Sequence, residues 1–227
     1  MKYGITLNKI VDDILNDKGG GISDDNYARE QIIFKVLRWR DLFIRRDIDR
    51  NGVNNIYQQT IPCLPLEYTN QTLCCGGESQ CKILRSISPI PQFVRLKKGF
   101  GYIVTSTTDD SVFPAMRHTE ARRLKYSRFT ANFKRAYIKP DNHLYILEED
   151  LTRFVNFTGI FFDPREAARF INCSGGPCYT DDDPFPLSGD LIDAIYAEIM
   201  KELNPVNQYD AIKEKTEKLE TDEVESN

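Results

Sequence analysis

The sequence lacks long apolar runs, and this absence limits where the protein can reside. No stretch approaches the roughly 18 consecutive apolar residues that a membrane span needs. Asn8, Lys9 and Asp12 interrupt the first apolar run, which argues against a secretory signal. We therefore expect a chain that is made in the cytoplasm and has no membrane partner.

Enzyme motifs are also missing. The chain has only two histidines, and it contains no H-E-x-x-H, G-x-S-x-G, phosphate-binding loop or dinucleotide fingerprint. The acidic run Asp181–Asp183 could hold a hard cation, as in a metal-dependent hydrolase. However, it directly precedes a predicted helix, where acids commonly serve as caps. We predict no catalytic residues and no enzyme activity.

The six cysteines follow no standard zinc spacing. In a chain made in the cytoplasm, we expect reduced, partly buried thiols rather than disulfides. A structural zinc ion is the less favoured alternative, so we predict no cofactor and no metal site. The cysteines in question are Cys63, Cys74, Cys75, Cys81, Cys173 and Cys178.

Both ends of the chain show apolar residues at helical spacing. Thr6 is a plausible N-cap for a first helix that stops at the glycines of 19–21. A second helix, capped by Ser23, is predicted from about Asp25 to Ile48. A third follows Ser188 and ends before Pro205. Three inward-facing stripes predict a helical bundle built from both termini.

The second predicted helix has more apolar surface than one contact needs. Phe34, Trp39 and Leu42 lie outside its main apolar arc. Either this helix sits centrally in the bundle or these residues face another subunit. We carry the second possibility forward as the hypothesis of a subunit interface.

The middle of the chain favours strands, so the predicted fold class is α+β, with an irregular antiparallel β-rich insert. The segment 139–143 has the composition of a hairpin turn, while Thr119 and Asp163 are placed to cap short helices. The predicted division is a helical bundle from 5–50 and 187–205, a β-rich insert over 51–186 and an acidic flexible tail over 206–227.

Charge is unevenly distributed along the chain. The whole sequence carries a formal charge of −4, and the tail alone, with seven acids against three lysines, accounts for it. A tail so poor in large apolar residues is expected to be disordered unless a partner orders it.

A basic run between 117 and 139 is the second charge feature. It could follow a phosphate backbone or face a partner protein. The alternatives are a solvated surface, or pairing with the acids of 148–150 on an adjacent subunit. A zinc-stabilised nucleic-acid-binding module is therefore the runner-up function. The candidate surface consists of Arg117, Arg122, Arg123, Lys125, Arg128, Lys134 and Arg135.

Several short phrases are distinctive as an ordered set, although each is weak alone. They are TLNKIVDDIL at 6–15, ISDD at 22–25, LFIRRDID at 42–49, CCG at 74–76, TGIFFDP at 158–164 and PCYTDDDPFP at 177–186. Together they resemble a virion protein family of crAss-like tailed bacteriophages, over about residues 5–204. The layout is also similar to head–tail adaptors of the tail tubular protein A type.

This resemblance implies a ring protein in the neck or tail of the virion, an adaptor that connects head to tail. The implied partners are other copies of the chain, in a ring that is expected to be twelvefold, together with the portal and neighbouring tail or neck rings. Double-stranded DNA would pass through the ring during genome ejection. The resemblance transfers no functional residue.

Overall fold

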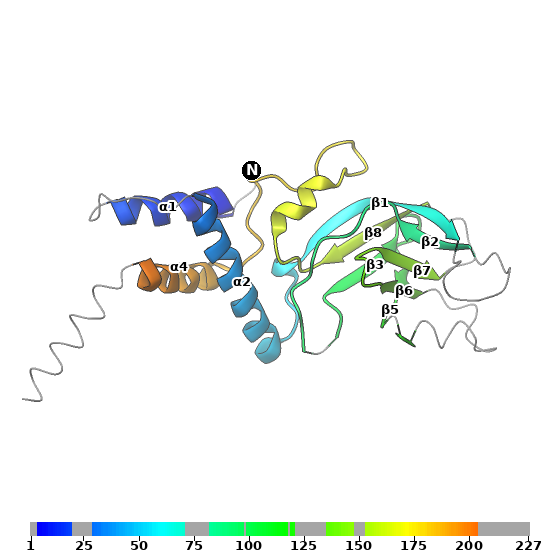
Figure 1. The fold of residues 1–227 in the computed structure, drawn as a ribbon, viewed down its shortest axis with the longest axis horizontal. Coiled ribbons are helices and arrows are strands. Elements are labelled where there is room, and N and C mark those ends of the chain that lie inside the picture. Colours follow the sequence, from blue (N-terminus) through cyan, green and yellow to red (C-terminus); the bar gives the residue numbers. More distant parts are fainter. Residues whose placement is uncertain are drawn as a thin grey trace, which may run out of the picture.

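The structure is a computed structural model that describes residues 4–19, 29–70, 82–97, 99–117, 119–120, 135–147 and 153–203. Helices gather at one end of the molecule and a strongly curved sheet forms the other (Figure 1). The predicted α+β class is therefore confirmed. No helix in the described ranges is long and apolar enough to cross a membrane. The predicted tail over 206–227 lies outside these ranges.

Three α-helices come from the two ends of the described chain. They are α1 (Leu7–Gly19), α2 (Arg29–Asn51) and α4 (Gly189–Leu203). Thr6 Oγ1 accepts a hydrogen bond from the Lys9 backbone N–H at 3.2 Å, which confirms the predicted cap. The predicted cap Ser23 lies outside the described residues, and α2 ends at Asn51 rather than at Ile48.

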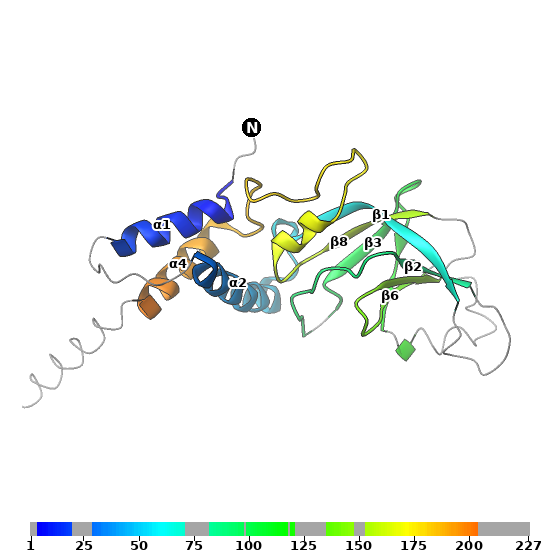
Figure 2. The same cartoon turned by 45° about the horizontal axis from the view of Figure 1, so that its top comes forward.

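The apolar stripes of these helices share one core. α1, α2 and α4 contact one another pairwise, and Figure 2 shows them side by side. Each fully buried aliphatic side chain contributes about 1.5–3 kcal/mol, so packing holds the three helices together. Their buried residues are Leu7, Ile10, Val11 and Ile14 from α1, Ile32, Ile33, Val36, Leu37 and Ile44 from α2, and Ile192, Ile195, Ile199 and Leu203 from α4.

The sheet has eight strands in the order β4-β3-β8-β1-β2-β7-β6-β5. A separate apolar cluster that includes Val104, Phe113, Ile146 and Phe157 fills its interior. The strands are β1 (Gln59–Asn70), β2 (Lys82–Ser86), β3 (Tyr102–Ser106), β4 (Val112–Phe113), β5 (Ala115–Met116), β6 (Arg135–Ile138), β7 (Leu144–Leu147) and β8 (Phe154–Gly159).

The two edges of this sheet meet. β4 and β5 lie at opposite ends of the strand order, yet only Pro114 separates them in sequence, and β5 also contacts β3. The sheet therefore curls into a nearly closed barrel. The sheet was predicted to be irregular and antiparallel, and this is wrong at one place, because β5 pairs with β6 in parallel. The chain passes from β4 at one edge to β5 at the other without a reversing turn. This sets the direction in which β5 runs.

Local turn and cap chemistry agrees with the sequence. Between β6 and β7, Lys139 N–H donates to the His143 carbonyl at 3.3 Å, and Asn142 adopts a positive φ of 58°. After β8, the short helix η2 (Pro164–Arg169) begins at Asp163, whose carboxylate accepts a hydrogen bond from Arg165 N–H at 2.9 Å. The predicted hairpin and the cap at Asp163 are both confirmed.

Arg40 joins the helices to the barrel. Its side chain is fully buried in the middle of α2. Its Nη1 donates to the carbonyls of Phe161 at 2.6 Å and Phe162 at 3.3 Å, just after β8, while Nη2 donates to the Pro186 carbonyl at 3.3 Å. Burial lowers the pKa of Arg40 to about 10, which still leaves the guanidinium charged at neutral pH.

Two further contacts lie on either side of Arg40 along α2. Near its start, Glu30 pairs with Arg165 of η2 at 3.5 Å. Near its end, the Asp47 carboxylate accepts a hydrogen bond from the Tyr57 hydroxyl at 2.6 Å, just before β1. α2 is thus attached at three points along its length to the segments that lead into and out of the barrel. These contacts limit rotation of α2 against the barrel.

We expect Arg40→Met to lower the free energy of unfolding by about 3 kcal/mol or more, because it leaves buried carbonyls without a donor. Arg50→Met, at an exposed position on the same helix, should change it by no more than about 0.5 kcal/mol. Urea titration followed by circular dichroism measures both. Equal stability of the two variants would contradict the role assigned to Arg40.

Candidate assembly surfaces

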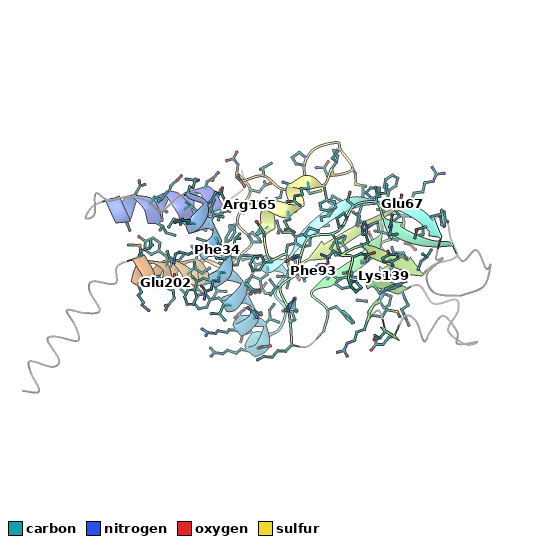
Figure 3. The ribbon with its side chains drawn as sticks, viewed as in Figure 1. Phe34, Glu67, Phe93, Lys139, Arg165 and Glu202 are labelled. Atoms are coloured by element: carbon teal, nitrogen blue, oxygen red, sulfur yellow. A yellow bond between two sulfur atoms is a disulfide. The ribbon has the colours of Figure 1, made fainter. Side chains whose placement is uncertain are left out.

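One side of α2 remains uncovered by the helical core. Phe34, Arg38, Leu42 and Arg46 follow one another at four-residue spacing, so they lie along one side of the helix. We call these four residues the α2 outer face. Phe34 is 61% exposed, Arg38 and Arg46 are exposed, and Leu42 is half-buried. Phe34 lies in the helical part of the molecule (Figure 3). A large exposed aromatic side chain followed by an arginine one turn later suits a protein contact.

Trp39 points to another side of the same helix. Its Nε1 donates to Glu202 of α4 at 3.1 Å, and its ring stacks on Phe43 with the centroids 5.7 Å apart. Lys35 also pairs with Glu202, and these bonds lower the pKa of the Glu202 carboxyl. Of the three predicted interface residues, the structure brings Phe34 and Leu42 onto one face, whereas Trp39 packs between α2 and α4. Their role in assembly stays a prediction.

The predicted basic surface is described only at its two ends. Arg117 is exposed, and its backbone N–H donates to the Glu120 carboxylate at 3.2 Å. Arg135 begins β6 and is half-buried. Arg122, Arg123, Lys125, Arg128 and Lys134 lie outside the described residues. The prediction of a DNA or partner surface therefore stays a prediction.

The prediction of reduced cysteines was wrong at two positions. Cys63 and Cys173 form a disulfide with their Cα atoms 5.3 Å apart, across a sequence separation of 110. The cause is local geometry in β1: its pairing with β8 shifts register between Ile61 and Leu64, and Cys63 adopts a positive φ of 54°. This bulge brings Cys63 next to the loop that follows η2.

Of the remaining metal candidates, only Cys178 and the acids of 181–183 lie in the described ranges. Cys178 is a free, half-buried thiol, and Cys74, Cys75 and Cys81 lie outside the described residues. Within the described ranges, no group of three or more metal-ligating side chains occurs. Asp183 instead accepts hydrogen bonds from the backbone N–H and the hydroxyl of Thr180, at 2.8 and 3.1 Å, as a turn cap does.

The disulfide borders a largely apolar cavity of about 520 Å³ that sequence reasoning missed. Ile61, Leu64 and Phe154 contribute to its walls, together with Ile171, which is 67% exposed. No sequence motif predicts this cavity, because its walls come mainly from β1 and the loop after η2, which are far apart in the sequence. It is a concave, largely apolar surface that is separate from the α2 outer face.

The described surface thus offers a mixed apolar and basic helix face and a largely apolar cavity, without a cluster of three or more metal-ligating side chains in the described ranges. A family model described as phage tail ring protein 2 matches residues 9–223. The chain belongs to this family. The resemblance to crAss-like phage ring proteins is thereby confirmed, and the protein is a structural ring component of a phage tail. A comparison with curated proteins finds no match.

For the disulfide, we expect peptide mapping under non-reducing conditions to recover Cys63 and Cys173 in one linked fragment. Cys63→Ser should lower the free energy of unfolding by about 2–5 kcal/mol, because the bond closes a long loop in the unfolded chain. Cys178→Ser is the matched control and should retain the linked fragment. Free, alkylatable Cys63 and Cys173 in the purified protein would refute the bond.

Proposed function

We propose that this ring protein forms a closed homo-oligomeric ring, expected to be twelvefold, in the neck or tail of the virion. It connects head to tail, binds the portal or a neighbouring ring, and surrounds the channel through which double-stranded DNA passes at ejection. Membership of the phage tail ring protein 2 family supports the ring itself. The helical bundle over 5–50 and 187–205, the insert over 51–186 and the tail over 206–227 are the units we assign to this assembly.

The observation that carries the proposal is the α2 outer face. α2 already buries five aliphatic side chains in the helical core and is fixed to the barrel through Arg40. Nevertheless it leaves Phe34 largely in solvent. Exposed aromatic residues, and arginines near them, are typical anchors of protein interfaces. Phe34 and Leu42 therefore supply one of the two faces that every subunit of a ring requires.

The surface that lines a DNA channel should carry little excess positive charge. Each neutralised phosphate adds affinity and hence friction, so a conduit must not hold DNA tightly. We assign the basic run from Arg117 to Arg135 to a protein neighbour rather than to the lumen. Outside the acidic tail, acids and bases balance over residues 1–205, which agrees with a channel that attracts DNA little.

Phe34→Asp should abolish ring formation, because a carboxylate replaces the apolar anchor. Phe34→Leu should preserve it, since it keeps an apolar side chain at the same position. Electron microscopy and analytical ultracentrifugation of the purified proteins measure the outcome. Because Phe34 is exposed, circular dichroism should show both variants folded. Rings formed by folded Phe34→Asp would remove Phe34 from the contact.

The assembled protein should bind double-stranded DNA weakly, with little dependence on salt. Fluorescence anisotropy with a labelled duplex, at several ionic strengths, measures this. Tight binding whose logarithm falls steeply with the logarithm of salt concentration would instead place the basic run on a nucleic-acid surface.

A further inference from the structure

The identity of the second ring face can be inferred from the helices, and this inference rests on the proposed function. In a closed ring, one face of each subunit meets a different face of the next. If the α2 outer face is the first, its counterpart must accept large apolar side chains and positive charge. It must also point away from the core of its own subunit.

The charge of α2 is the first clue. The helix carries seven basic residues against four acidic ones. All four acids are engaged, Glu30 with Arg165, Asp41 with Arg45, Asp47 with Tyr57 and Asp49 with Lys97. Arg38 and Arg46 form no ion pair within the described part of the chain. The Arg46 guanidinium lies over the Phe43 ring at 5.9 Å. The outer face therefore presents, beside Phe34 and Leu42, two cations that have no carboxylate partner in the described ranges.

α4 has the opposite character. Its 15 residues include four acids and one lysine. On the side of the helix away from the core, Lys201 pairs with Glu198 at 2.9 Å. Since Ile192, Ile195, Ile199 and Leu203 face the core, that same far side also carries Asp190, Ala194 and Ala197, with Asp193 beside them. We call these four residues the α4 outer face.

The two faces are complementary in size as well as charge. Asp190, Asp193 and Ala197 are exposed, and neither aspartate forms an ion pair with any described residue. Alanine side chains leave room for a larger partner to approach the helix closely. Phe34 and Leu42 are such partners, while Arg38 and Arg46 suit the two carboxylates.

The two outer faces cannot meet within one subunit. α2 and α4 already pack through their inner sides, with Trp39 and Lys35 contacting Glu202. Each outer face is directed away from that shared core. A contact between two copies of the α2 outer face is disfavoured, because it would place arginine against arginine. A second copy of the chain, offering α4, is the partner that fits.

We propose that the α2 outer face of one subunit docks on the α4 outer face of the next, with Phe34 and Leu42 against Ala194 and Ala197 and the arginines against Asp190 and Asp193. Charge reversal tests this pairing. One variant carries Arg38→Glu and Arg46→Glu, and the other carries Asp190→Arg and Asp193→Arg. All four positions are at the surface, so both variants should fold.

Each double variant alone should lose rings at concentrations where the wild type forms them. An equimolar mixture should regain rings of alternating subunits, because both contacts in it pair opposite charges. The quadruple variant should form rings by itself. Arg95→Glu with Arg153→Glu makes the same change in net charge as the arginine variant, at exposed positions outside both faces, and it should assemble like the wild type.

Sedimentation velocity and electron microscopy distinguish the outcomes. If wild type forms rings and either charge-reversal variant does so equally well, the α2–α4 pairing is wrong while the ring function stands. If both variants lose rings but neither the mixture nor the quadruple variant recovers them, the pairing is also wrong. If wild type stays monomeric at every accessible concentration, the proposed function fails and this inference fails with it.

Discussion

The position of the helices on the barrel depends on one buried guanidinium. Arg40 links three backbone carbonyls from two distant segments to the middle of α2, and it lies over the Phe185 ring at 5.5 Å. Backbone carbonyls cannot be exchanged by substitution, so the bonds depend on main-chain geometry rather than on neighbouring side chains. A buried charge tolerates little displacement from its partners. Together with the contacts of Glu30 and Asp47, Arg40 therefore holds α2 in one orientation on the barrel.

Local features could be predicted from the sequence, whereas features that join distant segments could not. The caps at Thr6 and Asp163 and the turn at Asn142 depend on a few adjacent residues, and the structure confirms each of them. Arg40 was missed, although it lies four residues from both Val36 and Ile44 and so interrupts a buried stripe. The sequence shows a charged residue within the stripe, but it does not show the carbonyls that accept its hydrogen bonds, because they lie more than 100 residues away in sequence.

The disulfide and the barrel closure were missed for the same reason. The Cys63–Cys173 bond requires a bulge in β1 and a loop that follows η2, and no cysteine spacing encodes that meeting. The parallel pairing of β5 follows from the sheet curling until its edges approach, which strand patterns alone do not specify. Among the candidate site residues, exposure separates Phe34 from Trp39, although both lay outside the predicted apolar arc.

The near closure of the sheet limits unselective strand pairing between crowded subunits. Subunits held side by side in a virion experience very high local concentrations, under which an open strand edge would pair with any neighbouring edge. Here the two edge strands, β4 and β5, have two residues each and lie beside one another. The barrel offers little main chain for such unselective pairing, so the choice of neighbour is left to side chains, which evolution can alter one at a time.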